Sequence, residues 1–220
     1  MKGGIIITGT DTGCGKTWFS WLLVKALREK GIDAVGWKPM CCGEREDAYA
    51  LESASEGQLT IDEVNPVWFR TPIAPFPAAE LEGGMADLDA LTRSGHELAE
   101  RHEVVVCEGV GGWEVPLTAE ENFSDFSKKL GWPVVLVIGN RLGALNHTFL
   151  TQSAIVEKGC DLRAAVLNQV IEEQDVAGVT NRGVIEQRIP GKIIGEVMHG
   201  AEVLEEEILE SLLTITQNNL

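Results

Sequence analysis

The segment Ile5-Ile6-Ile7-Thr8-Gly9-Thr10-Asp11-Thr12-Gly13-Cys14-Gly15-Lys16-Thr17 decides the fold of this chain. Its apolar run predicts a buried strand, a glycine-bearing loop follows, and Gly15-Lys16-Thr17 opens a predicted helix. Glycines let backbone N–H groups approach phosphate oxygens, the helix N-terminus adds partial positive charge, and Lys16 adds a full charge. The Thr17 hydroxyl can bind Mg²⁺. This pattern predicts a phosphate-binding loop, and the strand and helix around it disfavour an ordinary glycine-rich turn.

The spacing of this loop departs from the standard pattern by one residue. Four residues usually separate the first glycine from Gly-Lys-Thr, whereas five separate Gly9 from Gly15. Thr10 occupies the slot that the standard pattern gives to glycine. The loop predicts triphosphate binding, and the reaction has to be inferred from the rest of the chain.

Length and composition narrow the class of protein. The 220 residues predict one α/β domain spanning residues 1–220. Lys and Arg number 18 against 34 Asp and Glu, and the net charge of −16 argues against nucleic-acid and membrane partners. We find no secretion signal and no apolar run of about 20 residues, and the five cysteines lack metal-ligand spacing. We therefore expect a cytoplasmic protein with reduced thiols.

Two charged residues after the first predicted helix are candidate site residues, Lys38 and Asp47. Lys38 comes after a predicted strand over residues 33–37, which ends because Pro39 cannot continue the hydrogen-bonding ladder. Ligands of open parallel sheets bind at the carboxyl ends of the strands, so we expect Lys38 to face the phosphate loop, although a surface lysine before a turn is the alternative. Asp47 stands at the start of a short predicted helix, where helix capping and metal binding are equally compatible with the local pattern.

A further apolar run, residues 103–107, ends in Glu108 and a glycine-rich turn. This is the shape of a Walker B element, whose terminal carboxylate binds the Mg²⁺ of a phosphate loop. An unpaired carboxylate at the end of a buried strand would be costly, which favours the metal-binding interpretation. Gly109 and Gly111 would let the backbone approach a ligand closely.

The remaining patterns alternate between strand and helix. Predicted strands cover residues 132–139, 162–167 and 192–197, and predicted helices cover residues 87–102, 142–158 and 201–213. Such alternation indicates an α/β fold, a doubly wound and mostly parallel sheet flanked by helices, P-loop NTPase-like. Residues 74–77 are expected to form a rigid loop, and His96 and His102 are expected to be solvated.

In combination these motifs resemble those of the dethiobiotin synthetase family, the biotin-pathway enzymes that close a ureido ring. The resemblance extends from Gly9 to about Gly200. The matching segments are Gly9-Thr10-Asp11-Thr12 with Gly15-Lys16-Thr17, Gly36-Trp37-Lys38-Pro39, Asp47-Ala48, Glu108-Gly109-Val110-Gly111-Gly112-Trp113 and Gly143-Ala144-Leu145-Asn146-His147. The family's own longer phosphate loop accounts for the extra residue.

The resemblance implies a reaction. Diaminopelargonic acid, CO₂ and ATP with Mg²⁺ would give dethiobiotin, ADP and phosphate. An amine carbamate is a poor electrophile, so ATP would convert it to a carbamic-phosphoric anhydride before the second amine closes the ring. That step is phosphoryl transfer, which depends on positioning and charge neutralisation.

The resemblance also implies roles for individual residues. Lys16 and Lys38 would be catalytic, and the implied magnesium ligands are Thr17, Asp47 and Glu108. The implied nucleotide-binding positions are Thr12, Gly13, Cys14, Gly15, Lys16, Thr17, Trp18, Asp47, Glu108, Gly109, Val110, Gly111, Asn168, Gln169, Met198 and His199. The implied substrate-binding positions are Lys38, Cys42, Gly111, Gly143, Leu145 and Asn146.

A homodimer with its active site at the interface is a further implication. The substrate carboxylate would bind the helix N-terminus near Gly143 of the neighbouring subunit, and an anion at a helix start is physically reasonable. The chain departs from the family pattern at Cys42, where the family commonly has a serine, and at Met198-His199, where it commonly has a proline-containing turn. A thiol forms weaker and longer hydrogen bonds than a hydroxyl.

Two other classes share this fold. A partition-type P-loop ATPase would use ATP as a partner-regulated switch, but such proteins carry a second lysine early in the loop, where this chain has Asp11. Its C-terminal helix also lacks a basic face for DNA or membrane. A small-molecule kinase or another amide-forming ligase is a third interpretation, which Lys38 and Asn146 disfavour.

Overall fold

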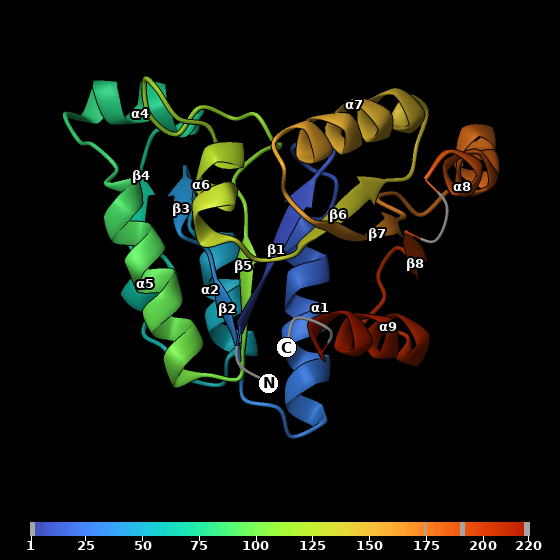
Figure 1. Ribbon diagram of the computed structural model, residues 1–220, viewed down its shortest axis with the longest axis horizontal. Coiled ribbons are helices and arrows are strands. Elements are labelled where there is room, and N and C mark those ends of the chain that lie inside the picture. The colour runs from blue at the N-terminus through green and yellow to red at the C-terminus, as the bar shows by residue number, and fades with distance from the viewer. Residues whose placement is uncertain (1–2, 174, 190–191, 218–220) are drawn as a thin grey trace.

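The computed structural model describes residues 3–173, 175–189 and 192–217 of the chain. Within these residues a parallel six-stranded sheet has the strand order β2-β5-β1-β6-β7-β8 (Figure 1). The strands are β1 (Gly3–Gly9), β2 (Ala34–Trp37), β5 (Val104–Glu108), β6 (Val134–Gly139), β7 (Leu162–Asn168) and β8 (Ile193–Val197). Two short strands, β3 (Met40–Cys42) and β4 (Val67–Phe69), form a separate parallel pair. The prediction of a doubly wound parallel sheet is confirmed.

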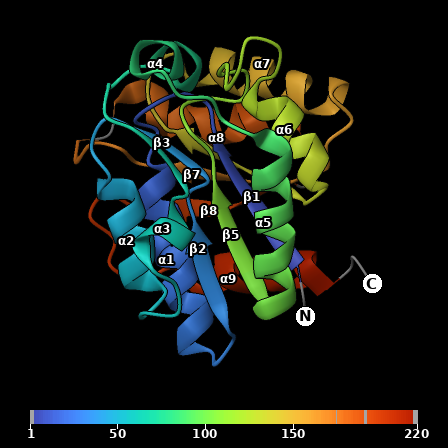
Figure 2. The ribbon, with the colours of Figure 1, turned by 90° about the vertical axis from the view of Figure 1, so that its left-hand side faces the viewer.

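Helices cover both faces of the sheet. The helices are α1 (Lys16–Glu29), α2 (Glu46–Ala54), α3 (Ile61–Val64), α4 (Pro75–Glu82), α5 (Leu88–Arg101), α6 (Phe123–Leu130), α7 (Ala144–Glu157), α8 (Val176–Arg188) and α9 (Glu206–Gln217). Figure 2 shows α1 and α2 on one side of β1, β2 and β5 and α5 on the other. Within the described ranges, no helix has the length and apolar composition needed to cross a bilayer.

Alternating side chains of the strands divide the core into two clusters. Ile6 packs with apolar residues of α5, α6 and α7, whereas Ile5 and Ile7 pack with those of α1 and α9. This alternation follows from the two-residue period of a strand, and burial on both faces explains the continuous apolar runs in the sequence.

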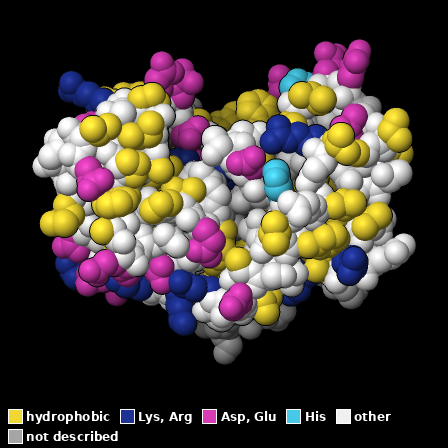
Figure 3. Space-filling model, turned by 90° about the horizontal axis from the view of Figure 1, so that it is seen from above, with side chains coloured by type: hydrophobic (Ala, Val, Ile, Leu, Met, Phe, Trp, Pro, Cys, Tyr) yellow, Lys and Arg dark blue, Asp and Glu magenta, His cyan; other side chains and the backbone are white. Residues whose placement is uncertain are grey.

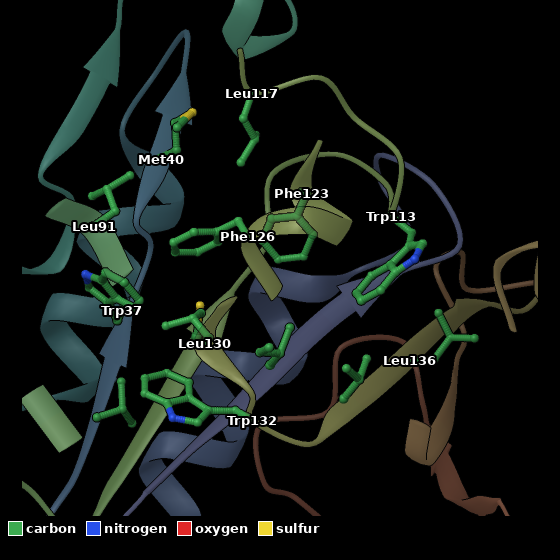
Figure 4. Close-up of a cluster of buried hydrophobic side chains, with 14 of the residues drawn as sticks. Trp37, Met40, Leu91, Trp113, Leu117, Phe123, Phe126, Leu130, Trp132 and Leu136 are labelled. Carbon is green, nitrogen blue, oxygen red and sulfur yellow. The ribbon is translucent and has the colours of Figure 1, made fainter. Parts of the chain in front are cut away.

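An aromatic group lies between the sheet and helices α5 and α6 (Figure 4). The rings of Trp37 and Phe126 lie 6.1 Å apart, and those of Trp37 and Trp132 lie 6.3 Å apart in an edge-on arrangement. A Cβ added at Gly95 of α5 would lie 2.8 Å from the Trp37 ring, so this helix approaches the sheet as closely as it does because residue 95 is glycine. Trp37 is fully buried, and its packing fixes the end of β2 from which Lys38 follows.

Several local predictions were wrong. Residues 74–77 are not a loop, because Pro75 and Pro77 lie in the first turn of α4, where a missing N–H costs no helical hydrogen bond. The last helix begins at Glu206 rather than at 201. His102 is buried, with Nδ1 3.0 Å from Asp33 Oδ2, whereas His96 is exposed as predicted.

Candidate active site

The loop between β1 and α1 is built for close backbone approach. Gly13 and Gly15 have φ values of 73° and 91°, a conformation that residues with side chains rarely adopt. A Cβ at Gly15 would also lie 1.9 Å from Asn168 Nδ2, which donates a hydrogen bond of 2.9 Å to the carbonyl of Cys14. No side chain caps the start of α1, so its first N–H groups remain available to an anion.

Lys16 lies over this loop. Its Nζ donates a hydrogen bond of 3.0 Å to the carbonyl of Asp11, and the side chain is largely buried. The ammonium group therefore faces the same space as the free N–H groups of the helix start. This arrangement suits an anion with several oxygens, as the sequence predicts.

Four side chains from separate elements converge beside the loop, and we call Thr17, Lys38, Asp47 and Glu108 the acid–lysine cluster. Lys38 Nζ lies 2.9 Å from Asp47 Oδ2 and 2.5 Å from Glu108 Oε1, and it donates a further hydrogen bond of 3.2 Å to the carbonyl of Gly109. Thr17 Oγ1 lies 2.8 Å from Asp47 Oδ1 and 2.8 Å from Glu108 Oε1. The convergence that the sequence predicts for these residues is present.

Burial and charge act in opposite directions on this cluster. Burial disfavours the Lys38 ammonium, but the charges of Glu108 and Asp47 outweigh this effect and hold the Lys38 pKa above its ordinary value. Burial likewise disfavours the Asp47 carboxylate, but Lys38 and Thr17 hold the Asp47 pKa below its ordinary value. Both groups are therefore charged at neutral pH, as expected of a buried lysine paired with a partly exposed carboxylate.

Asp47 does not cap α2, so one of the two interpretations left open by the sequence is excluded. The N-cap position is Arg45, without a side-chain cap hydrogen bond, and Asp47 lies in the first helical turn. From there its carboxylate points to Thr17 and Lys38 rather than to backbone N–H groups. Metal or ligand binding remains as the functional interpretation.

The oxygen atoms of the cluster fit Mg²⁺. A hydroxyl and two carboxylates are hard ligands, and Glu108 Oε2 is buried without a hydrogen-bond partner among the described residues. No group of three His, Cys, Asp or Glu side chains suited to a metal occurs in the described part of the chain. A cation here would therefore need phosphate oxygens and water to complete its coordination, which is the usual situation for Mg²⁺.

A cavity of about 570 Å³ opens in front of the cluster. Thr12, Gly13, Gly15, Lys16 and Thr17 line one side, whereas Lys38, Cys42, Asp47, Glu108, Val110 and Gly111 line another. The segment from Pro72 to Pro75 adds a mainly apolar wall. Seen from above, the molecule is hollowed between two raised sides, with basic and acidic side chains near the hollow (Figure 3).

Cys42 lies on the wall of this cavity, as its predicted substrate contact requires. Its thiol is partly buried, and burial raises the Cys42 pKa to about 11. The group is a neutral thiol at neutral pH and hence a weak hydrogen-bond donor.

A second cavity of about 280 Å³ lies on the other side of the phosphate loop and shares Gly13 and Gly15 with the first. Its lining comprises Gly13, Gly15, Trp18, Asn168, Gln169, Val170, Met198, His199 and Gly200. Asn168, Gln169, Met198 and His199, which are predicted nucleotide-binding positions, are therefore brought together. Cys14 lines neither cavity, and its carbonyl accepts the hydrogen bond from Asn168.

Gly143, Leu145 and Asn146 lie outside both cavities, at the start of α7. Gly143 has a φ of 92° and provides no side-chain cap, so the first N–H groups of α7 are free of side-chain partners. Asn146 is exposed. Within one chain, these three positions are not part of the site around Lys38.

The sequence did not indicate several residues that shape the site. Asn65 is buried, and its Nδ2 donates a hydrogen bond of 2.8 Å to the carbonyl of Lys38, while Lys38 N donates one of 2.8 Å to the carbonyl of Val64. These bonds fix the backbone that carries the lysine. The apolar wall at residues 72–75 was also missed, because the sequence pattern of residues 74–77 indicated only a rigid loop.

Solved structures show the same fold at low sequence identity. The ParA family ATPase from Chlorobium tepidum superposes with a TM-score of 0.56 at 14% identity, covering 99% of this chain and 93% of that chain. The pNOB8 ParA bound to nonspecific DNA superposes with a TM-score of 0.62 at 8% identity, and the match covers all of both chains. The cell division protein FtsY from Thermotoga maritima superposes with a TM-score of 0.56 at 18% identity, and the match covers 97% of this chain and 69% of FtsY. The fold and loop thus define a P-loop NTPase-like α/β protein.

Sequence relatives identify the family. An AAA domain family matches residues 3–207. The ATP-dependent dethiobiotin synthetase of Akkermansia muciniphila is 48% identical over 204 residues, which cover 93% of this chain and 96% of that protein. That of Anaeromyxobacter sp. (strain Fw109-5) is 38% identical over 208 residues, 93% of each. The chain belongs to the dethiobiotin synthetase family and is an ATP-dependent ligase.

Proposed function

We propose that this chain carboxylates diaminopelargonic acid with CO₂ and closes the ureido ring of dethiobiotin at the expense of ATP. The observation that carries the proposal is the convergence of Lys38, Thr17, Asp47 and Glu108 beside the phosphate loop. The identity of the substrates is inferred from family membership. The cavity in front of the cluster is the proposed meeting place of the carbamate and the γ-phosphate.

The reaction divides into three balanced steps. One amine of the substrate adds to CO₂ and loses a proton, which gives a carbamate. A carbamate oxygen then attacks the γ-phosphorus of ATP, the bond to the leaving ADP oxygen breaks, and a carbamic-phosphoric anhydride forms. The second amine attacks the carbonyl carbon, loses a proton and expels phosphate, and the ring closes.

The two lysines have different tasks in this scheme. Lys16, at the start of α1, would hold the β- and γ-phosphates together with the loop N–H groups. Lys38 would neutralise the negative charge that the carbamate and the γ-phosphate share during transfer. To do so, its ammonium group would leave a carboxylate partner such as Glu108 and bind the substrate instead. Such stabilisation by fixed charges is the main protein contribution to phosphoryl transfer.

Thr17, Asp47 and Glu108 would hold Mg²⁺ together with phosphate oxygens. When bound, the ion would neutralise phosphate charge and orient the terminal phosphate for in-line attack. The free Glu108 Oε2 and the partly exposed Asp47 carboxylate are the chain's acceptors for such an ion.

We also propose that the site is completed in a homodimer. The uncapped N-terminus of α7 offers N–H groups for the substrate carboxylate, yet it lies outside the cavity of its own chain. An aliphatic chain passing Ile73 and Val115 could reach such an anchor on a neighbouring subunit.

A phosphate-release assay tests the function. ATP alone should give slow release, and addition of diaminopelargonic acid with bicarbonate should raise the rate at least about tenfold, since the acceptor is the carbamate rather than water. A partition-type switch, whose fold the ParA structures share, would hydrolyse ATP without regard to the diamine. A rate unaffected by the diamine would therefore reject the ligase and favour the switch.

A further inference from the structure

One wall of the reaction cavity is a short segment, residues 70–75, which we call the wall segment. It joins Phe69, the last residue of β4, to Pro75, the first residue of α4, and the residues that it places on the cavity are Pro72, Ile73, Ala74 and Pro75. Helix α4 lies beside β3 and β4 (Figure 1). If the proposed function is correct, the aliphatic chain of the substrate passes this wall, so the position of the wall affects substrate binding.

The backbone holds the wall segment at its two ends. Strand β4 is paired with β3 as far as Phe69, and Phe76 N donates a hydrogen bond of 3.2 Å to the carbonyl of Pro116. Between these points the segment has no strand partner. Its two prolines have no N–H to donate, and Ile73 N donates within the segment, to the carbonyl of Thr71 at 2.9 Å. The middle of the wall therefore depends on a side chain from elsewhere.

Glu82, the last residue of α4, provides that side chain. Its Oε1 accepts a hydrogen bond of 2.7 Å from Thr71 N, and its Oε2 accepts one of 3.1 Å from Arg70 N. The bonds with Thr71 hold the Glu82 pKa below its ordinary value, so the group is a carboxylate at neutral pH. Hydrogen bonds to an ionised acceptor are stronger than those between neutral groups. The carboxylate thus clamps the two N–H groups that directly precede Pro72.

This clamp determines how Pro72 lies against the turn after Cys42. Gly43 has a φ of 82°, and a Cβ added there would lie 3.0 Å from Pro72 Cβ, so Pro72 packs closely on the turn. Trp68 Nε1 donates a hydrogen bond of 2.7 Å to the Gly43 carbonyl and holds the turn in place. Release of the clamp would therefore shift Pro72 relative to Cys42, on the substrate side of the cavity.

We propose that Glu82 is a positioning residue for the substrate, whose carboxylate holds Pro72 and Ile73 where they pack against the aliphatic chain of the diamine. Glu82 itself lines neither cavity and acts through the wall segment. Its loss would leave the phosphate loop and the acid–lysine cluster in place, so the bound substrate would react at its usual rate. Loss of binding that the ground state and the transition state share raises KM without lowering kcat.

Steady-state kinetics of the full chain test the effect on the substrate. In Glu82→Ala we expect the KM for diaminopelargonic acid to rise at least about tenfold, while kcat and the KM for ATP stay within about twofold. Glu82→Gln loses the same charge but keeps one acceptor oxygen, so its KM should lie between those of the wild type and Glu82→Ala. Glu80→Ala is the matched control, since Glu80 is an exposed glutamate of the same helix, and it should behave as the wild type.

Amide hydrogen exchange tests the clamp without any substrate. Nuclear magnetic resonance of the isotope-labelled wild-type chain should show the Arg70 and Thr71 amides protected relative to an unstructured chain, because both are hydrogen-bonded. In Glu82→Ala both amides should exchange at least about tenfold faster. Glu80→Ala should leave their exchange unchanged.

The outcomes separate the clamp from the proposed function. An unchanged KM for the diamine in Glu82→Ala overturns the proposal. Equal increases in Glu82→Ala, Glu82→Gln and Glu80→Ala also overturn it, because they would show attraction of the diamine by negative charge. Unprotected Arg70 and Thr71 amides in the wild type overturn it whether or not the variants fold. Amides that Glu82→Ala releases, in a chain without diamine-dependent phosphate release, would support the clamp and reject the ring-closing function.

Discussion

Lys38 Nζ lies 2.5 Å from Glu108 Oε1, although 70 residues separate the two in sequence. The sheet explains this proximity. In the parallel pairing of β2 with β5, Trp37 lies opposite Cys107. The residues that come next along the chain, Lys38 and Glu108, therefore lie close to each other. A cation and an anion that each follow an apolar run are thereby placed side by side, at the edge where the phosphate loop begins.

Lys38→Ala should slow ring closure strongly while leaving nucleotide binding largely intact. Lys38 is assigned to charge that develops during transfer, so its loss should lower kcat by about 10²–10³ and change the ADP dissociation constant by no more than about threefold. Steady-state kinetics and calorimetry measure the two effects, with Lys128→Ala at an exposed lysine as the control. Undiminished turnover would remove Lys38 from the catalytic residues.

Lys38→Met should also reduce stability, because it leaves Glu108 as a buried charge with no compensating ammonium. Breaking such a pair costs about 3–5 kcal/mol. The double variant Lys38→Met with Glu108→Gln should recover most of this loss, since both charges are then absent. Denaturant unfolding of Lys38→Met, Glu108→Gln and the double variant gives the free energy of unfolding of each and hence the coupling energy between the two residues. Strictly additive losses of this free energy would show that the ion pair has no energetic role.

Gly15→Ala should be more damaging than Gly13→Ala. Both glycines have positive φ, which costs a side-chain residue about 1–2 kcal/mol. A Cβ at Gly13 meets open space, whereas one at Gly15 meets Asn168 Nδ2 and would displace its bond to Cys14. Thermal unfolding should give the larger decrease in Tm for Gly15→Ala, and equal decreases would contradict the close packing of Asn168 on the loop.

Asp47→Asn should raise the Mg²⁺ concentration needed for half-maximal turnover by at least about tenfold, because it removes an anionic ligand and leaves a neutral amide. Glu46→Gln is the matched control, since Glu46 is the exposed neighbour on the same helix. A magnesium titration of both variants checks the assignment. The same magnesium requirement in Asp47→Asn and the control would place the ion elsewhere.

Cys42 should react slowly with alkylating agents. With a pKa of about 11, its thiolate fraction at pH 8 is about 100-fold smaller than for a thiol of pKa 9. Because the shift is upward, the alkylation rate should rise about tenfold per pH unit until pH approaches 11. Mass spectrometry measures the alkylation rate of Cys42 in the folded chain, and the chain unfolded in guanidinium chloride is the reference. Bound diaminopelargonic acid and nucleotide should slow the alkylation further. Labelling that ignores these ligands would place Cys42 outside the site.

The sequence indicated the parallel sheet and the charged residues at its strand ends because both depend on local patterns. Glu108 ends an apolar run that is typical of a buried parallel strand, and Lys38 directly follows another such run. Each pattern by itself predicts that the charged residue lies at the carboxyl edge of the sheet. The partners that hold these residues depend on distant packing, which no local pattern records. Asn65 reaches Lys38 from 27 residues away, and the burial of His102 depends on Asp33, 69 residues earlier.

The transfer of oxygen from CO₂ to phosphate tests the ring-closing account most directly. If a carbamate oxygen attacks the γ-phosphorus beside Lys38, freshly added ¹⁸O-labelled CO₂ with ATP and diaminopelargonic acid should give phosphate that carries one labelled oxygen, with the second label in the ureido carbonyl. Mass spectrometry of the released phosphate measures this. Unlabelled phosphate, with its new oxygen derived from water, would contradict the proposed reaction.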